Sequence, residues 1–133
     1  MATFHVELVS PEKLLFTGEA ESATVPSIDG EMMVLANHAP LMAVLKSGTV
    51  RIKDASGEQR LFVRGGFADV NPEGLTILAE YAVPVSEIDA AGVEGQLRDA
   101  EEALRNAKTQ EDKVLAGEKI VQLRDLREAA VSR

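Results

Sequence analysis

Apolar and polar residues alternate in several short segments of the first two thirds of the chain. Phe4, Val6 and Leu8 alternate with polar residues, and Val50 and Ile52 do the same. A period of two places successive side chains on opposite faces of a β-strand. Turn-forming sequences separate the segments: Ser10-Pro11-Glu12, Asp29-Gly30, Lys46-Ser47-Gly48, Ala55-Ser56-Gly57, Gly65-Gly66 and Asn71-Pro72-Glu73-Gly74. Short strands at this spacing indicate an all-β sandwich or barrel.

Two segments of this half lead to specific expectations. The pair Gly65-Gly66 is expected to form a turn between two strands, because glycine adopts the positive φ angles that many turns need. The run from Leu75 to Leu78 is continuous enough to predict a buried strand.

The sequence changes character after Pro84. All five prolines lie at or before this position, and the remainder is rich in Ala, Glu and Arg. We therefore expect a β domain at 1–85 and helices at 86–133, with the boundary near Pro84–Glu87. Apolar residues recur at helical spacing in two stripes: Ala90, Val93, Leu97, Ala100, Ala103, Leu104, Ala107, and Leu115, Ala116, Ile120, Leu123, Leu126, Ala130. Two such helices with a short turn pack as an antiparallel hairpin.

Local signals place the ends of these helices. Ser86 is expected to cap the first helix, with Glu87 and Asp89 in its first turn, where the helix dipole favours acids. Thr109 is expected to cap the second helix. The outer face of the first helix carries acid–base pairs at i,i+4 spacing: Glu94–Arg98 and Glu101–Arg105. The predicted fold class is thus α+β by segregated halves, a β domain followed by a helical hairpin.

Composition and charge exclude several classes of protein. The chain has 133 residues, a net charge of −8 and no cysteine. The acidic balance disfavours nucleic acid and anionic lipid as partners. No apolar run approaches the ~18 residues of a membrane span, so direct membrane insertion is not expected. The first residues lack the basic and apolar regions of a signal peptide.

Candidate catalytic residues are few. The chain has no phosphate-binding glycine motif and no nucleophile elbow. Asp29 and Glu31 could pair as acid and base, but they flank Gly30 in a predicted turn, and a solvated turn is the simpler interpretation. His38 stands alone in a loop, and metal sites need three or four converging ligands. We therefore expect no enzyme activity, no metal and no cofactor.

Five ordered sequence blocks nevertheless resemble one family. The first is Asp29-Gly30-Glu31 followed by an apolar strand, His38-Ala39-Pro40-Leu41 and an apolar run that ends in Lys46-Ser47-Gly48. The others are Val9-Ser10-Pro11-Glu12 with Phe16-Thr17-Gly18-Glu19, Arg64-Gly65-Gly66-Phe67-Ala68-Asp69-Val70, Leu75-Thr76-Ile77-Leu78-Ala79, and Ile120-Val121-Gln122-Leu123-Arg124. Taken in their order along the chain, the five blocks are similar to the epsilon subunit of bacterial-type F-type ATP synthases. The similarity covers nearly the whole chain.

The resemblance implies an N-terminal antiparallel β-sandwich, a C-terminal helical hairpin and a place in the central stalk of the rotor. Residues 1–85 would contact the gamma subunit and the c-subunit ring, through Glu31 and His38. Met32 and Met33 are interpreted either as core residues or as adaptable partner surface. The complex would lie on the cytoplasmic face of the bacterial inner membrane, with this chain as a peripheral subunit that couples proton transport to ATP synthesis.

The resemblance also implies a regulatory role for residues 86–133. The hairpin can lie folded or extend along gamma into the catalytic head, where it restrains ATP hydrolysis. Lys119, Arg124 and Arg127 interrupt or border the second apolar stripe. Their long stems could cover apolar surface while the charges reach water. The family implies instead that they meet an acidic segment of the alpha/beta head when the hairpin extends.

Three alternatives remain open from the sequence. In the first, the hairpin senses a nucleotide: some relatives bind ATP through Ile/Leu-Asp-x-x-Arg-Ala. Here Ile88 and Asp89 are present, but Gly92 stands where the motif has arginine, which argues against ATP binding. In the second, the chain is a free-standing coiled-coil adaptor, which would need no ordered motifs in the β domain. In the third it is a hydrolase that uses His38 with Asp29 or Glu31, without an oxyanion motif to support it.

Overall fold

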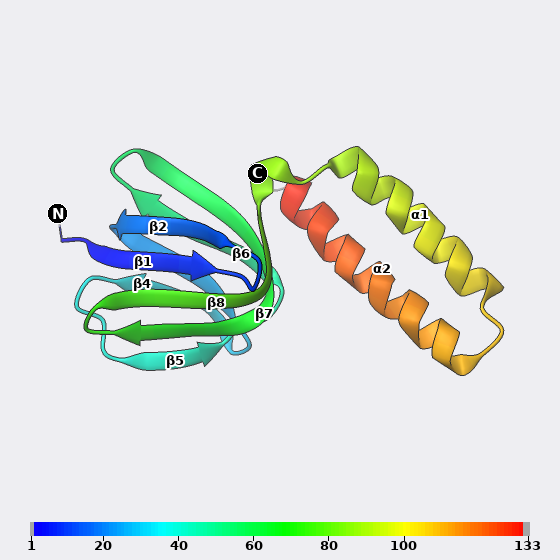
Figure 1. The fold of residues 1–133 in the computed structure, drawn as a ribbon, viewed down its shortest axis with the longest axis horizontal. Coiled ribbons are helices and arrows are strands. Elements are labelled where there is room, and N and C mark those ends of the chain that lie inside the picture. Colours follow the sequence, from blue (N-terminus) through cyan, green and yellow to red (C-terminus); the bar gives the residue numbers. More distant parts are fainter. Residues whose placement is uncertain (1, 132–133) are drawn as a thin grey trace. The chain divides into compact units, whose positions relative to one another are not determined.

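The computed structural model describes residues 2–131 and divides into two compact units, Met1–Val85 and Ser86–Arg133. The strands of the first unit are β1 (Phe4–Val9), β2 (Leu14–Ala20), β3 (Ser22–Ser27), β4 (Gly30–Leu35), β5 (Leu41–Val44), β6 (Gly48–Asp54), β7 (Gly57–Asn71) and β8 (Gly74–Pro84). A 3-10 helix, Val85–Glu87, precedes α1 (Ala90–Asn106) and α2 (Gln110–Val131) (Figure 1). The predicted fold class, a β-sandwich followed by two helices, is confirmed.

The strands form one folded-over sheet with the order β2-β1-β8-β7-β6-β3-β4, and β5 pairs with β7. Neighbouring strands are antiparallel except for β1 and β8, which are parallel. The alternation seen in the sequence turns one side of each strand inward. The core side chains include Val6, Leu8, Val25, Val34, Val50, Ile52, Val63, Leu75 and Ile77, all essentially buried. Burial of these apolar side chains is what holds the two layers together.

The prediction of a turn at Gly65-Gly66 is wrong. Both glycines lie inside the single long strand β7, and both have positive φ angles, 72° and 117°. Before this point β7 pairs with β6, and after it β7 pairs with β5, while β8 runs alongside both halves. The pair is therefore a kink at which one strand passes from one layer of the sandwich to the other.

The buried run predicted from Leu75 to Leu78 is only half right. Leu75 and Ile77 point into the core, whereas the side chain of Leu78 is 52% exposed. The strand obeys the period of two, so two apolar neighbours point to opposite faces. Leu78 thus lies on an outer face of the sandwich, and packing in the core does not explain why this position is apolar.

The second unit is an antiparallel helical hairpin. Its ion pairs join the two helices: Arg127 lies 3.6 Å from Glu94, and Arg124 lies 4.0 Å from Glu101. The higher-numbered partner in α1 pairs with the lower-numbered arginine in α2, as is expected when two helices run antiparallel. The expected pairs with Arg98 and Arg105 along α1 are not formed within the described residues. The two glutamates pair across the hairpin because the second helix brings arginines to the same edge.

The helix ends match one expectation and correct another. Thr109 caps α2, because its Oγ1 accepts a hydrogen bond from the Asp112 N–H at 3.1 Å. Ser86 does not cap α1; it lies in the 3-10 helix. Asp89 is the cap instead, and its carboxylate accepts a hydrogen bond from the Gly92 N–H at 3.0 Å. An N-cap of this kind is worth about 1 kcal/mol.

Candidate functional site

A row of apolar side chains crosses the outer face of one layer of the sandwich. The pairing registers place Val44 opposite Phe67, Phe67 opposite Leu78, Leu78 opposite Val9, and Val9 opposite Leu14. Directly paired residues point to the same face, so these five residues, here called the apolar band, line up across five strands. With strands about 4.8 Å apart, the band extends over roughly 19 Å.

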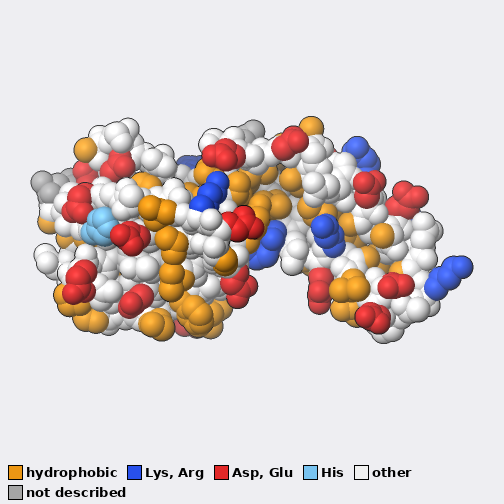
Figure 2. Space-filling model, viewed as in Figure 1, with side chains coloured by type: hydrophobic (Ala, Val, Ile, Leu, Met, Phe, Trp, Pro, Cys, Tyr) orange, Lys and Arg blue, Asp and Glu red, His pale blue; other side chains and the backbone are white. Residues whose placement is uncertain are grey.

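The apolar band is exposed and has an acidic border. Val44, Phe67, Leu78 and Leu14 are each between 44% and 53% exposed. The next row along the strands contains Asp69 and Glu7, together with Met42 and two threonines. Figure 2 shows hydrophobic side chains in a band over this unit, with acidic side chains beside it. A contiguous exposed apolar patch of this kind marks an interaction surface.

A hollow of about 410 Å³ lies in the apolar band. Its lining includes Val9, Pro11, Gly66, Phe67, Leu78 and Glu80. Apart from the Glu80 carboxylate and the Ser10 hydroxyl, the side chains that line the hollow are apolar or absent. Such a hollow suits a side chain or small apolar group better than a charged ligand.

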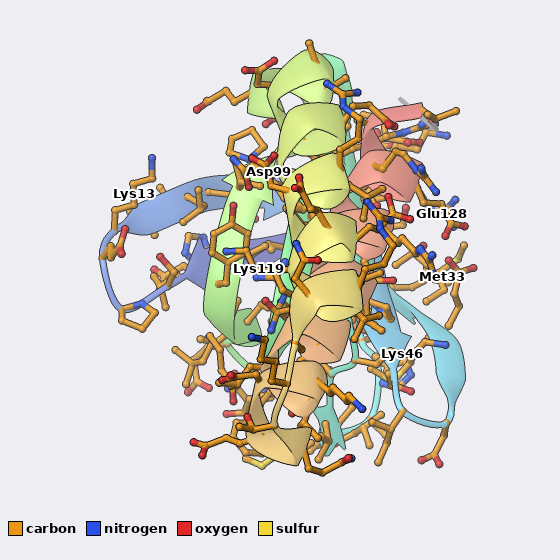
Figure 3. The ribbon with its side chains drawn as sticks, turned by 90° about the vertical axis from the view of Figure 1, so that its right-hand side faces the viewer. Lys13, Met33, Lys46, Asp99, Lys119 and Glu128 are labelled. Carbon is orange, nitrogen blue, oxygen red and sulfur yellow. The ribbon has the colours of Figure 1, made fainter. Side chains whose placement is uncertain are left out.

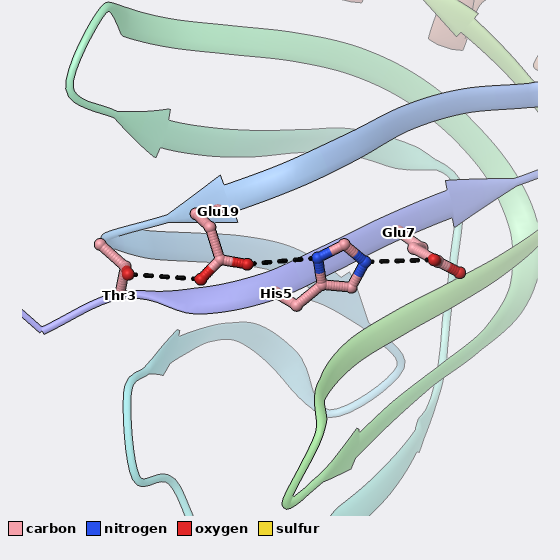
Figure 4. Close-up of polar contacts among 4 residues, drawn as sticks. All are labelled: Thr3, His5, Glu7 and Glu19. Atoms are coloured by element: carbon pink, nitrogen blue, oxygen red, sulfur yellow. Dashed lines mark hydrogen bonds and ion pairs between the residues drawn. The ribbon is translucent and has the colours of Figure 1, made fainter.

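A polar cluster occupies the far end of the same face (Figure 4). The His5 ring is held between Glu7, 3.1 Å from Nε2, and Glu19, 3.2 Å from Nδ1; Thr3 donates a hydrogen bond to Glu19 at 3.4 Å. The hydrogen bond to Glu7, with a smaller contribution from Glu19, raises the pKa of His5 above its ordinary value. The contact with Glu19 ties β1 to β2, and the raised pKa favours the protonated ring that makes this tie an ion pair.

The residues expected to contact partners through β4 lie at the opposite edge of the sheet order. Glu31 is exposed and forms an ion pair with Arg51 of β6 at 3.3 Å. Met32 packs against the core, whereas Met33 is 58% exposed, and Figure 3 shows its side chain pointing away from the strands. The two methionines thus divide between the two interpretations. The Arg51 partner of Glu31 could not be read from the sequence, because β3 and β6 must first pair.

His38 lies in the exposed loop between β4 and β5. The Nδ1 atom of its ring is 2.9 Å from the carbonyl oxygen of Ala39, and the backbone N–H of His38 donates a hydrogen bond to the Leu35 carbonyl oxygen. Neither Asp29 nor Glu31 contacts the ring. Asp29 lies in the turn before β4, where its backbone N–H donates a hydrogen bond to the Ser27 hydroxyl oxygen. The structure therefore does not bring together the acid, base and histidine of the hydrolase alternative.

The candidate residues of the helical unit are also placed. Lys119 lies exposed on α2 (Figure 3), while Arg124 and Arg127 are engaged with the glutamates of α1. Ile88 is buried, and the Asp89 carboxylate is used as the cap of α1. The residues named for nucleotide binding thus have structural roles in this hairpin.

Neither a metal centre nor a membrane-spanning helix is found among residues 2–131. Within residues 2–131, no three or more His, Asp or Glu side chains are grouped so that they could hold a metal ion. No helix among these residues is both long and apolar enough to cross a membrane.

A two-layer sandwich with an exposed apolar band, followed by a helical hairpin, defines a class of small two-part proteins. Residues 3–85 match the family described as the ATP synthase delta/epsilon chain, beta-sandwich domain. The ATP synthase epsilon chain of Parvibaculum lavamentivorans is 40% identical over 91% of this chain and 92% of the relative. That of Mesorhizobium japonicum is 44% identical over 92% of each chain. This chain belongs to the ATP synthase epsilon chain family.

Solved structures show the same fold at lower identity. A chain in the Euglena gracilis mitochondrial ATP synthase, solved as OSCP/F1/c-ring, superposes with a TM-score of 0.81 at 24% identity, covering 97% of this chain and 82% of that one. A chain in the Tetrahymena thermophila mitochondrial ATP synthase central stalk and c-ring has a TM-score of 0.66 at 17% identity, covering 96% of each chain. The resemblance stated from the sequence blocks is confirmed by the family match.

Proposed function

We propose that this chain is a non-catalytic subunit of the rotor of a proton-translocating ATP synthase. Its β-sandwich docks on the gamma subunit and on the c-subunit ring at the foot of the central stalk. Its hairpin restrains ATP hydrolysis by reaching toward the alpha/beta head. The complex would sit at the cytoplasmic face of a bacterial inner membrane, with this chain peripheral to the bilayer.

The apolar band is the observation that carries the proposal. Four of its side chains are about half exposed, although each is large enough to stabilise an interface when buried. Burying such side chains contributes roughly 1.5–3 kcal/mol each in the limit of full burial. Membership of the family supports an ATP synthase subunit as the partner. The apolar band supports gamma in particular, because a subunit that rotates together with this chain must be held firmly. Glu31 and Met33, on β4, are proposed as the contact with the c ring.

A second observation supports the regulatory part. Arg124 and Arg127 pair with acidic residues of α1 in the closed hairpin, at surface positions where such pairs are weak. An acidic segment of another subunit could therefore compete for the same arginines. Lys119 would join them in the extended state. Two states of similar energy are what a switch requires.

The test is reconstitution of the F1 subcomplex and of stripped membranes with and without this chain. We expect the full chain to bind, to lower ATP hydrolysis and to restore ATP-driven proton pumping. A chain that ends at Val85 should restore pumping without inhibiting hydrolysis. Replacing Lys119, Arg124 and Arg127 with Ala should raise hydrolysis and leave coupling nearly intact. If the full chain neither binds nor changes either activity, the proposal is wrong.

A further inference from the structure

The kink at Gly65-Gly66 borders the hollow in the apolar band, whose lining includes Gly66. Gly66 approaches the opposite strand so closely that a side chain there would collide with the backbone of Leu78. At Gly65 the neighbouring side chain takes the space that a Cβ would need: a Cβ at this position would lie 2.7 Å from the Glu80 carboxylate oxygen Oε2. The hollow thus lies beside this close approach, lined by Gly66, Phe67 and Leu78, with the Glu80 carboxylate at its rim.

The rim charge has no ion-pair partner among residues 2–131. Among the described residues, no Lys, Arg or His lies within ion-pair distance of the Glu80 carboxylate. The apolar walls therefore suit an apolar side chain, and the single carboxylate suits a cationic group beside it. Interface hot spots have this composition, an apolar anchor in a pocket with a charged pair at its edge.

We propose that this hollow is an anchor socket for the docked subunit. It receives one large apolar side chain between Phe67 and Leu78, and a Lys or Arg next to that anchor pairs with Glu80. This inference rests on the proposed docking through the apolar band and specifies the chemistry of the partner. It also gives the Gly-Gly pair a role beyond shaping the strand, since a side chain at Gly66 would strike the backbone of Leu78 and one at Gly65 would displace the Glu80 carboxylate.

The experiment measures binding of the full chain to the immobilised F1 subcomplex stripped of this subunit, at low and at high salt. Leu78→Ala should weaken binding about tenfold at both salt concentrations, because it removes a wall of the socket. Glu80→Gln should weaken binding a few-fold at low salt and reduce the salt dependence. Glu80→Lys should weaken binding more, because it repels the incoming cation.

Two matched controls lie away from the socket. Leu35→Ala removes an equally exposed leucine, 51% against 52%, on β4. Glu73→Gln neutralises an exposed acid in the turn of the same β7–β8 hairpin. Both should bind within about twofold of the parent chain, since exposed residues outside an interface are usually neutral. Thermal unfolding of each variant confirms that the sandwich is folded.

The outcomes are distinguishable. If the parent chain binds but the Leu78 and Glu80 variants bind as tightly as their controls, the socket is refuted and the proposed docking is not. If Glu80→Gln weakens binding equally at all salt concentrations, the pairing with a cation is refuted. If the parent chain itself does not bind the stripped F1 subcomplex, the proposed function fails and the socket fails with it.

Discussion

Removing the acidic partners of Arg124 and Arg127 should strengthen the proposed inhibition of ATP hydrolysis. In the closed hairpin these arginines pair with Glu101 and Glu94 of α1. The double substitution Glu94→Gln and Glu101→Gln weakens the closed state but leaves both arginines available to another subunit. Glutamine has nearly the helix propensity of glutamate, so α1 itself should persist. The direction is opposite to that expected when the arginines themselves are replaced.

The magnitude follows from the geometry of the two pairs. Their N–O distances are 3.6 and 4.0 Å, and all four side chains are more than 40% exposed. Solvent screening then limits each pair to about 0.2–0.5 kcal/mol. Together they contribute up to about 1 kcal/mol, which corresponds to roughly a fivefold change in a two-state equilibrium. The inhibited fraction should therefore rise measurably if the closed and extended states are close in energy.

Two measurements on the same preparations test this. Amide hydrogen exchange should show faster exchange in α1 and α2 of the double variant, with the sandwich unchanged. ATP hydrolysis by the reconstituted enzyme should fall, and high salt should reduce the difference between variant and parent. The control carries Glu102→Gln and Glu118→Gln, two exposed acids of the same helices that form no ion pair among the described residues.

Either of two results would show that the two ion pairs do not control inhibition. Faster exchange in the helices with unchanged or increased hydrolysis would mean that opening of the hairpin does not inhibit. A control variant that behaves like the double variant would mean that net charge matters and the two pairs do not.

The remaining predictions concern the sandwich. A fragment of residues 1–85 should unfold in one cooperative β-type transition, measured by circular dichroism, and an aggregated fragment would contradict this. Glu31→Lys should lower proton pumping more than it lowers the melting temperature, because the lost pair with Arg51 is exposed; normal pumping would exclude the proposed contact. The raised pKa of His5 contributes stability that is present below about pH 6.5 and lost as the pH rises through the folded-state pKa. The melting temperature should therefore fall more between pH 6 and pH 8 in the parent than in His5→Gln, and equal slopes would refute the tie. Gly66→Ala should destabilise the sandwich by more than about 2 kcal/mol in denaturant unfolding, because its φ is 117° and its Cβ would strike the opposite strand.

The sequence could predict features that depend on neighbours along the chain. The period of two identified the core side chains of β1 and β6, and the hydroxyl of Thr109 identified a helix cap. The stripes of α1 and α2 identified Val93, Leu97 and Ile120 as buried. In each case the determining contacts lie within a few residues, so local spacing carries the information.

Features that depend on register between distant strands were missed. The apolar band exists only because β5, β7, β8, β1 and β2 align in one register, and none of its five members stands out in the sequence. The apolar neighbours of Leu78 predict a core position, and the Gly65-Gly66 pair predicts a turn because turns are its commonest use; the structure shows neither. The partners of Glu31, Glu94 and Glu101 likewise lie on other elements. A signal for the band would have been the apolar residue at the outward position of each strand.

The parallel pairing of β1 with β8 has a consequence for how the chain acquires its fold. The first strand lies between β2 and the last strand, and the register joins His5 to Gly74, about 70 positions later. Contacts at such separation are slow to form, because a long loop must close before they contribute. During synthesis, the β1–β2 hairpin therefore waits with one edge unpaired until β8 has left the ribosome. The sheet can close only once β8 is available, and the helices that follow β8 in the chain contribute no strand to it.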